Sequence, residues 1–148
     1  MKAPEWQDAA PVFTKALSQI DPGTVHIHND LTGLFVFADP LLERVLYNLV
    51  DNALRYGEKV TTIRARYRKD NGGLILVIED DGVGIPAKNK SLIFNKGFGK
   101  HTGLGLFLAR EILAITGMVI METGFPGTGA RFEIHLPPGG YRFADKAT

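Results

Sequence analysis

The sequence lacks cysteine, any long apolar run and any strong net charge, and each absence excludes a class of protein. With no cysteine among its 148 residues, the chain has neither a disulfide framework nor a thiolate metal site. Its longest strongly apolar run, residues 74–78, is far shorter than the roughly 20 residues that a membrane-spanning helix needs. The formal net charge of +1 gives no overall attraction to nucleic acid or to a membrane surface.

The composition fits one compact domain in a reducing compartment. Hydrophobic residues make up 45% of the chain and charged residues 22%, which are ordinary values for a soluble globular protein. The first residues, MKAPEWQD, lack the apolar stretch of a signal peptide. We therefore expect a cytoplasmic domain, and any membrane anchor of a longer parent protein would lie outside this chain.

Apolar periodicity and turn residues predict three helices and six strands. Helices are expected at residues 11–20, 40–56 and 104–116. Asp39 should cap the second of these helices and Gly57 should end it. Strands are expected at residues 25–29, 34–37, 60–68, 74–79, 118–122 and 130–136, the last four as two hairpins. This order indicates an α/β (α+β) fold, a two-layer sandwich with helices covering one face of a mixed, mostly antiparallel sheet.

The middle helix has an apolar stripe beside a polar one. At about 100° per residue, the apolar stripe contains Leu42, Leu46, Leu49 and Ala53. The adjacent stripe contains Asn48, Asp51, Asn52 and Arg55. Asparagine is a mediocre helix former, so two of them one turn apart need a reason. Two interpretations stay open: a solvated helix face, or an amide-oxygen ligand for Mg²⁺, an ion that takes few protein ligands besides water and phosphate.

The sequence LILVIEDDGVGIP places an Asp-x-Gly-x-Gly pattern, beginning at Asp80, at the end of a predicted buried strand. The glycines permit a ligand to approach the backbone closely, and the Asp80 carboxylate can accept a hydrogen bond from an amino group. Ile85 and Pro86 would add an apolar wall. An acidic tight turn is the alternative interpretation. A calcium-binding loop would need further oxygen ligands at regular spacing, and this segment lacks them.

A second glycine-rich segment, GFGKHTGLGLFLAREIL, leads into the third helix. A helix N-terminus that follows such a turn favours phosphate, and Lys96, Lys100 and His101 add positive charge. The spacing matches neither a Walker P-loop nor a dinucleotide fingerprint. Taken alone, a flexible glycine loop with basic residues favours a solvent-exposed linker over a phosphate site.

The three elements in this order resemble the Bergerat-fold ATPases, which include gyrase, the ninety-kilodalton chaperones, histidine kinases and mismatch-repair proteins. The string NLVDNALRYG resembles the asparagine box of sensor histidine kinases, DDGVGIP resembles their first glycine box, and TGLGLFLAREI resembles their second. Ile93-Phe94 with Gly97-Phe98 resembles the phenylalanine box between them. The resemblance covers roughly residues 25–136 and implies an ATP-binding catalytic domain.

At the phosphate end, the resemblance implies that Asn48 coordinates Mg²⁺, that Asn52 lies beside the phosphates and that Arg55 reaches a phosphate. Asn48 and Arg55 would be the catalytic residues. Residues 86–102 would form a lid over ATP, to which Lys96 and Lys100 would add phosphate contacts. The start of the third helix would hold the phosphates through Thr102, Gly103, Leu104, Gly105 and Leu106.

At the base end, the resemblance implies that Tyr56 packs against adenine and that Asp80 binds adenine N6. Gly82 and Gly84 would lie beneath the base, with Ile85 beside it. The lid is short for the family, since few residues separate Gly84 from the second glycine box.

One departure from the ATP-hydrolysing relatives bears on the reaction. Those relatives resemble one another in carrying a glutamate one turn before the metal asparagine, as general base for water. Arg44 occupies that position here, and Glu43 is rotated by about 100° from it. A kinase needs no such base because its nucleophile is a histidine nitrogen, so we expect phosphoryl transfer and at most slow hydrolysis.

The acceptor histidine is expected to lie outside this chain. His26, His28, His101 and His135 all fall in predicted strands or loops, and none lies on a helix beside an acidic residue, which is the family's acceptor setting. The resemblance therefore implies two partners, a dimerisation domain of the same parent protein and a downstream response regulator. The isolated domain is expected to be monomeric and not to bind nucleic acid.

The sequence divides the chain into three parts: a helical connection to the missing dimerisation domain at residues 1–23, the ATP-binding catalytic domain at residues 24–137 and a polar tail at residues 138–148. Two alternative functions stay open. One is a self-contained ATPase of the same fold, which Arg44 disfavours. The other is a non-catalytic nucleotide-binding or interaction module, which the complete set of motif residues disfavours.

Overall fold

The structure is a computed structural model that describes residues 2–98 and 105–144. Its elements follow one another along the chain as β1 (Glu5–Asp8), α1 (Ala9–Leu17), β2 (His26–Asn29), β3 (Leu34–Ala38), α2 (Leu42–Tyr56), β4 (Thr62–Asp70), β5 (Gly73–Asp80), the 3₁₀ helix η1 (Ala87–Asn89), α3 (Gly105–Ala114), β6 (Val119–Glu122), β7 (Arg131–Leu136) and β8 (Tyr141–Phe143). The helices and strands expected from the sequence are all present, with ends that match or are shifted by at most three residues.

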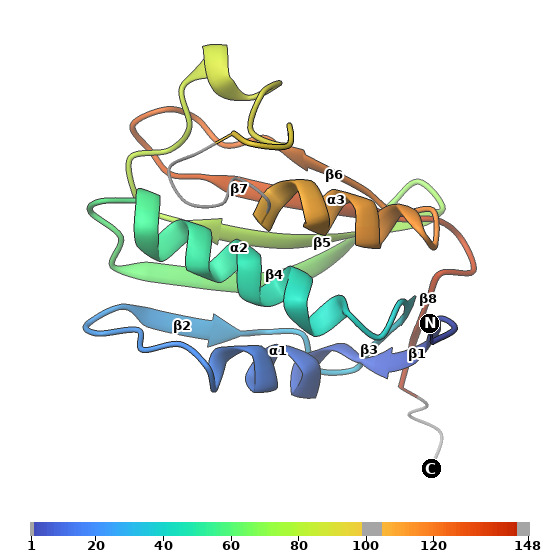
Figure 1. Ribbon diagram of the computed structural model, residues 1–148. Coiled ribbons are helices and arrows are strands. Elements are labelled where there is room, and N and C mark those ends of the chain that lie inside the picture. The colour runs from blue at the N-terminus through green and yellow to red at the C-terminus, as the bar shows by residue number, and fades with distance from the viewer. Residues whose placement is uncertain (1, 99–104, 145–148) are drawn as a thin grey trace.

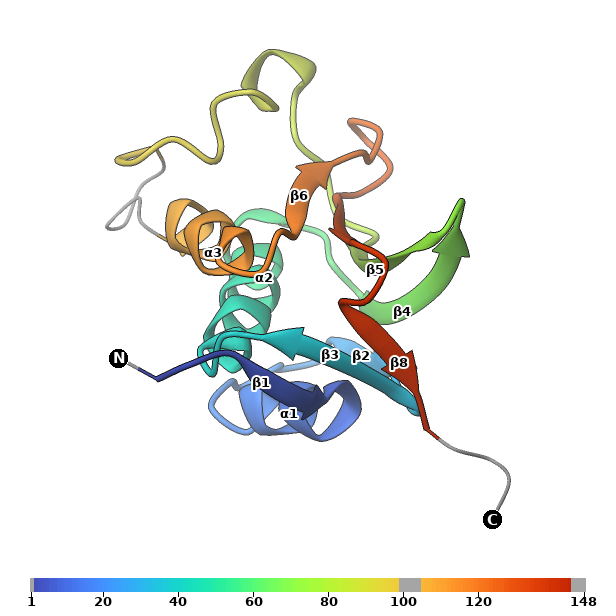
Figure 2. The same cartoon turned by 90° about the vertical axis from the view of Figure 1, so that its right-hand side faces the viewer.

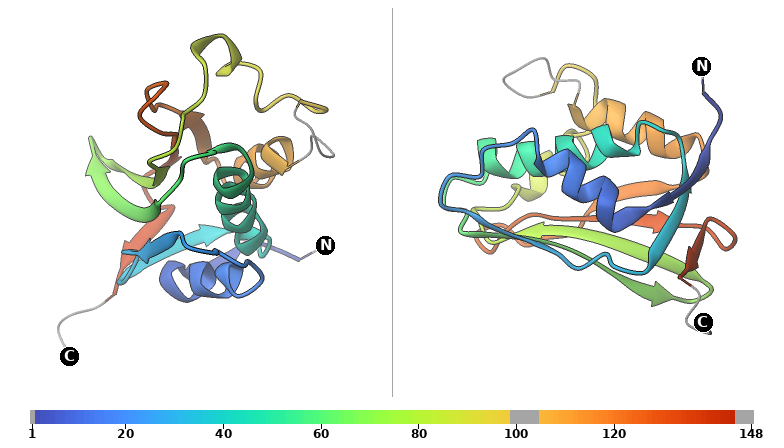
Figure 3. Two further views of the ribbon diagram at one scale, coloured as in Figure 1. Left: turned by 90° about the vertical axis from the view of Figure 1, so that its left-hand side faces the viewer. Right: turned by 90° about the horizontal axis from the view of Figure 1, so that it is seen from below.

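Helices and strands form two layers, as the right panel of Figure 3 shows. The main sheet has the order β2-β4-β5-β7-β6, in which only the β2–β4 pair is parallel. The helices α1, α2 and α3 lie together on one face of this sheet, with α2 between the other two (Figure 1). The predicted two-layer sandwich with a mixed, mostly antiparallel sheet is confirmed.

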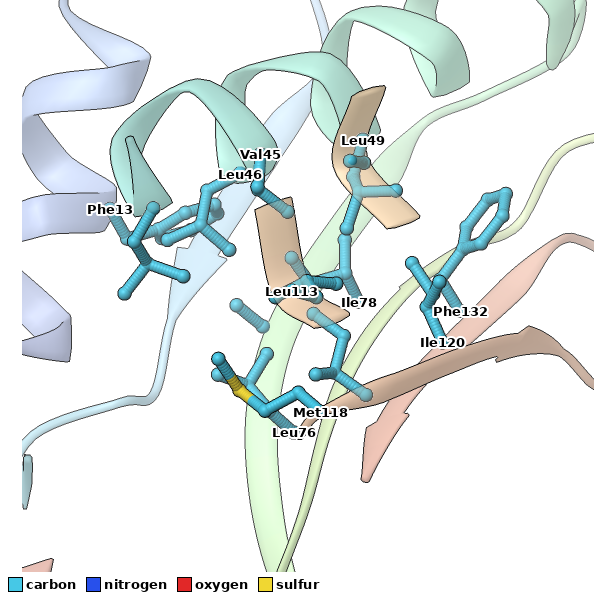
Figure 4. Packing of buried hydrophobic residues seen from close by; sticks show 14 of the residues in the cluster. Phe13, Val45, Leu46, Leu49, Leu76, Ile78, Leu113, Met118, Ile120 and Phe132 are labelled. Atoms are coloured by element: carbon cyan, nitrogen blue, oxygen red, sulfur yellow. The ribbon is translucent and has the colours of Figure 1, made fainter. Parts of the chain in front are cut away.

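Aliphatic and aromatic side chains from both layers meet in one core (Figure 4). α2 contributes the largest helical share, because its apolar stripe lies against the sheet and against both neighbouring helices. Its buried residues are Leu42, Val45, Leu46, Leu49, Val50 and Ala53. The sheet contributes four fully or nearly fully buried side chains, Ile63, Leu76, Ile78 and Ile134. Burying each large aliphatic side chain stabilises the fold by roughly 1.5–3 kcal/mol.

Local sequence signals set several element ends. The prediction that Asp39 caps α2 is wrong, because the helix begins at Leu42 with Leu41 at the N-cap position. The Asp39 carboxylate instead accepts a hydrogen bond from the Leu41 N–H at 2.8 Å in the turn before the helix. Asn71 and Gly72 both have positive φ, 42° and 87°, which is the tight two-residue turn that Asn-Gly favours between β4 and β5. Gly57 ends α2 for a different reason: a Cβ there would lie 2.1 Å from Val60 Cγ2.

The sequence did not predict two of the strands, β1 and β8, and the expectation of a polar C-terminal tail is wrong where β8 forms. β1 and β8 pair antiparallel with the two edges of β3, which makes a separate three-stranded sheet. Residues 138–148 were expected as a polar tail, but Tyr141–Phe143 form β8 and the Phe143 ring stacks on the Tyr67 ring at 5.9 Å. Trp6 on β1 contacts the Phe37 ring and the Arg142 guanidinium. Figure 2 shows β1, β3 and β8 side by side.

Ending the chain at residue 138 should lower the free energy of unfolding by roughly 2–4 kcal/mol, because it removes the aromatic contacts of β8 and the apolar area that this strand covers. Chemical denaturation followed by circular dichroism measures the change. A chain ending at residue 144, which keeps β8, is the matched control and should match the full chain. Equal stability of the two truncated chains would mean that β8 contributes nothing.

Candidate functional site

A cavity of about 800 Å³ opens beside the polar stripe of α2. Its walls come from α2, from the loop that follows β5, from the start of α3 and from the connection between β6 and β7. The residues that line it are Arg44, Tyr47, Asn48, Asp51, Asn52, Arg55, Tyr56, Glu58, Val83, Gly84, Ile85, Pro86, Asn89, Ile93, Phe98, Gly105, Leu106, Leu108 and Pro126. The volume and the mixture of apolar walls with a few polar groups are typical of a small-molecule site.

The α2 wall presents amides and a guanidinium in fixed positions. Asn48 Nδ2 donates a hydrogen bond to the Gly105 carbonyl at 3.2 Å, which ties α2 to the first residue of α3 and orients the amide. Arg55 Nε donates to Asp51 Oδ2 at 2.8 Å, one helical turn away. The hydrogen bond and the negative charge of Asp51 raise the pKa of Arg55 above its ordinary value, so the guanidinium stays charged.

The opposite wall is the turn that follows β5. Gly84 has φ of 77°, a conformation that favours glycine. A Cβ at Gly84 would lie 2.9 Å from the Phe125 carbonyl and 3.1 Å from Pro126 Cα, so this turn fits closely against the β6–β7 connection. Ile85 and Pro86 continue the wall and supply apolar surface.

Asp80 lies at the base of this turn and does not line the cavity itself. Its Oδ1 accepts hydrogen bonds from the backbone N–H groups of Gly82 at 2.8 Å and Ala130 at 3.2 Å. Burial raises the pKa of Asp80 above its usual value, and the nearby charges of Asp81 and Glu122 raise it further, while the two hydrogen bonds oppose the shift. No described residue hydrogen-bonds to Oδ2, which leaves that oxygen as an acceptor.

The pKa of Asp81, the next residue, is shifted in the opposite direction. Burial acts to raise its pKa, but hydrogen bonds from the Thr61 hydroxyl and from the Thr61 and Thr62 N–H groups outweigh that effect and lower the pKa of Asp81 below its usual value. Its carboxylate fastens the turn to the start of β4. Asp81 is therefore a structural anchor outside the cavity.

The structure brings most of the described predicted site residues to one cavity: Asn48, Asn52, Arg55, Tyr56, Gly84, Ile85, Gly105 and Leu106. Gly82 is not among the lining residues, and a Cβ there would lie 2.4 Å from the Gly57 carbonyl, so its small size serves the contact between two chain segments. Lys96 is exposed, with its ammonium 6.0 Å from the Phe107 ring centre, and does not line the cavity. Lys100, Thr102, Gly103 and Leu104 lie outside the described residues.

Sequence reasoning missed several lining residues. Tyr47 and Asp51 flank Asn48 on α2, and helical spacing alone could have placed them on its edge. Arg44 also lines the cavity, one turn before Asn48, with its guanidinium 4.6 Å from the Tyr47 ring centre. Pro126 reaches the cavity from the β6–β7 connection, and no pattern in the sequence indicated that contact.

The described part of the predicted lid is anchored to the protein at two places. Ile93 and Phe94 are buried, and the Phe94 ring meets the Phe132 ring edge-on with centres 6.2 Å apart. Lys90 forms an ion pair with Glu122, whose side chain is completely buried. Residues 86–98 therefore lie against the body of the domain on the side of the cavity formed by the β6–β7 connection.

The profile of the family described as "Histidine kinase-, DNA gyrase B-, and HSP90-like ATPase" matches residues 38–140. Among curated proteins, the chain is 32% identical over 146 residues to the sensor protein KdpD of Escherichia coli strain K12, which covers 90% of this chain and 16% of KdpD. The chain spans a similarly small share of the other sensor proteins that it matches, such as 17% of KinB from Pseudomonas aeruginosa.

Solved structures show the same architecture. The mycobacterial sensor histidine kinase MprB superposes with a TM-score of 0.79 and 25% identity, over 91% of this chain and 97% of that one. Full-length ShkA in complex with AMPPNP superposes with a TM-score of 0.78 and 19% identity, over 97% of this chain and 32% of that one.

The opposite pKa shifts of Asp80 and Asp81 predict opposite effects on stability. The pKa of Asp80 is higher in the folded protein than the ordinary 3.8, so its ionisation above the folded pKa costs stability at pH 7. We expect Asp80→Asn to raise the melting temperature by a few degrees at pH 7. The gain should vanish below about pH 3.8, where Asp80 is protonated in both states.

Asp81→Asn is the matched control, with the opposite sign. Its lowered pKa means that the ionised carboxylate contributes stability above the ordinary pKa, and that this contribution is lost as the pH falls through the folded pKa. We expect Asp81→Asn to lower the melting temperature at pH 7. Thermal unfolding of both variants from pH 3 to pH 8 checks the pair, and two shifts of the same sign at pH 7 would contradict the assignment.

Proposed function

Because this chain belongs to the family of histidine kinase-, DNA gyrase B- and HSP90-like ATPases, we propose that it binds Mg-ATP and phosphorylates a histidine on a separate dimerisation domain. The observation that supports this most directly is the single cavity that joins the polar face of α2 to the Gly84–Pro86 turn. A nucleotide needs polar and cationic groups at one end and an apolar slot with a hydrogen-bond acceptor at the other. The lining of this cavity offers the polar and cationic groups at one end and the apolar turn at the other, and Asp80 lies at the base of that turn.

The α2 side fits the phosphates and a magnesium ion. The hydrogen bond from Asn48 Nδ2 to Gly105 leaves Asn48 Oδ1 without a partner among the described residues, and an amide oxygen is a suitable Mg²⁺ ligand. The described residues contain no group of three acidic or histidine side chains that could hold a metal alone. The phosphates and water would therefore supply the remaining ligands, and the ion would neutralise charge that develops on the transferred group.

Asn52 and Arg55 extend the same face of α2. Asn52 offers an amide beside the phosphates. Arg55, kept charged by Asp51, offers a guanidinium that can donate a charge-assisted hydrogen bond to a phosphate oxygen. Gly105 and Leu106, at the first turn of α3, line the cavity at the point where a helix N-terminus favours an anion. Lys96, Lys100, Thr102, Gly103 and Leu104 are proposed to complete this end.

The turn after β5 fits the base. Asp80 Oδ1 is occupied by two backbone N–H groups, so Oδ2 is the acceptor that remains for the adenine N6 amino group. Ile85 and Tyr56 both line the cavity and offer flat or apolar surface to the ring. Gly84, whose missing side chain lets the turn lie close to the β6–β7 connection, keeps the slot open.

The side chains around Asn48 favour phosphoryl transfer over hydrolysis. Arg44 lines the cavity one turn before Asn48, where a water-activating carboxylate would stand in a hydrolase. Glu43 points elsewhere: its carboxylate accepts a hydrogen bond from Gln19 at 3.0 Å and lies 3.6 Å from the Lys15 ammonium. Asp51 does line the cavity, but it is held by Arg55. No described carboxylate therefore combines that position with freedom to take a proton from water.

The acceptor and the downstream partner are proposed from the family alone. We place the acceptor histidine on a dimerisation domain of the same parent protein, joined through residues 1–23, and a response regulator downstream. Among the described residues, no helix has the length and apolar character needed to cross a membrane. A cytoplasmic position, where ATP is available, is part of the same proposal.

Asn48→Ala should weaken Mg-ATP binding by roughly ten- to hundredfold, because it removes the amide oxygen proposed to hold the metal. Asp80→Asn should weaken it similarly, since an amide N–H would face the adenine amino group. Isothermal titration calorimetry with and without Mg²⁺ measures both changes, and the effect of Asn48→Ala should be confined to the Mg²⁺-dependent part. Asn95→Ala, at an exposed position outside the cavity, is the control. Unchanged affinity in both variants would favour a non-catalytic interaction module.

Radiolabelled γ-phosphate should appear on a purified dimerisation domain of the parent protein when this chain is added, and ATP hydrolysis without that domain should be slow. The reason is that no described carboxylate lies one turn before Asn48 with freedom to take a proton from water. Replacing the acceptor histidine by glutamine should abolish the label. Rapid ATP turnover by the isolated chain would favour a self-contained ATPase instead.

A further inference from the structure

The segment Val83–Lys90 runs along the cavity and is attached to the β6–β7 connection at both of its ends. At the first end, the Gly127 N–H donates to the Val83 carbonyl at 2.6 Å. At the second end, Lys90 Nζ donates to the Gly124 carbonyl at 2.9 Å and forms its ion pair with Glu122. In Figures 1 and 2 the segment rises beside this connection. Four residues between the two attachments line the cavity: Gly84, Ile85, Pro86 and Asn89.

Glu122 ties the two ends of the β6–β7 connection together. Its Oε2 accepts hydrogen bonds from the Gly124 N–H at 2.9 Å and the Arg131 N–H at 3.0 Å. Its Oε1 receives Lys90. Because the Glu122 side chain is completely buried, its charge needs both these hydrogen bonds and a cation. Lys90 is thus fixed to the residue that shapes the connection.

The wall and the connection fit together closely enough that a small displacement would alter the cavity. A Cβ on Gly84 would meet the Phe125 and Gly129 carbonyls at 2.9 and 3.1 Å. Pro126, in the same connection, lines the cavity directly. Losing one of the two attachments therefore changes both the position of the wall and the surface opposite it.

We propose that Lys90 is a positioning residue for the nucleotide cavity: through Glu122 and Gly124 it holds the Gly84–Pro86 wall in the geometry that accepts the base. The inference rests on the proposed function. Lys90 itself does not line the cavity, so its effect on binding is transmitted through the wall and not through contact with ATP.

Lys90 also supports binding of the base through the electrostatics around Asp80. The Ala130 N–H donates to Asp80 and the Arg131 N–H donates to Glu122, so the two carboxylates accept hydrogen bonds from consecutive residues at the start of β7. Besides burial, the charges of Asp81 and Glu122 raise the pKa of Asp80. The Lys90 ammonium offsets the charge of Glu122, which favours the ionised Asp80 that the base would contact.

The test compares Lys90→Met, which removes the charge at similar size, with Lys90→Arg, which restores it. Lys88→Met is the control, because Lys88 is exposed and forms no ion pair with any described residue. ATP dissociation constants are measured at a temperature where circular dichroism shows every variant folded. We expect Lys90→Met to raise the dissociation constant by about three- to thirtyfold, Lys90→Arg to recover most of the affinity and Lys88→Met to leave it unchanged. A lower melting temperature with an unchanged dissociation constant would reduce the ion pair to a structural role and overturn the proposal.

A nucleotide-free measurement separates this inference from the proposed function. Backbone amide exchange of the chain without ATP should be faster in Lys90→Met at Leu92 and Ile93, whose N–H groups donate to the Asn89 carbonyl beside Lys90. If the unaltered chain binds no ATP, the proposed function fails while the exchange data still report on the attachment. Unchanged exchange at these amides would overturn the inference even if ATP binds.

The double variant Lys90→Met/Glu122→Gln covers the case in which Lys90→Met does not fold. It leaves no unpaired buried charge, and the glutamine carbonyl keeps the hydrogen bonds from Gly124 and Arg131. We expect it to fold and still to bind ATP more weakly than the unaltered chain, because the attachment to the wall is gone. Full affinity in the double variant would contradict the proposal.

Discussion

The packing of α2 is the constraint on which the site depends. One face of the helix is buried against the sheet and against α1 and α3, so the helix cannot rotate without exposing Leu46 and Leu49. The adjacent face is then fixed toward the cavity, with Asn48 and Asn52 pointing into it. The hydrogen bond from Asn48 to Gly105 extends this constraint to the start of α3. The asparagine positions are thus set by leucines on the other side of the helix.

Much of this arrangement could be predicted because the signals are local. The 3.6-residue period of apolar side chains predicted α2 and its two stripes, and Asn71-Gly72 predicted the hairpin that positions Asp80. The order of the three glycine and asparagine motifs then indicated one nucleotide site. The two stripes proved to be a core face and a cavity face, so the asparagines line the cavity that the proposal assigns to a nucleotide.

What could not be predicted depends on partners that are distant in the sequence. β1 and β8 are only four and three residues long, and each exists because β3 offers a free edge. The low exposure of Glu122 follows from Lys90, Gly124 and Arg131 converging on it, and a single glutamate near a strand end gives no such indication. Gly82 was interpreted as a ligand contact, whereas its fit against Gly57 depends on how α2 ends.

β3 is held on both edges, by β1 before it and β8 after it, and only three residues separate its end at Ala38 from the start of α2 at Leu42. The Gln7 side chain donates hydrogen bonds to the carbonyls of Ala38 and Asp39, so β1 also contacts the segment that connects β3 to α2. Hydrogen bonds therefore connect β1, through β3 and the residues that follow it, to the start of the helix that carries Asn48. The position of the cavity's asparagine face is thus coupled to how β1 pairs with β3.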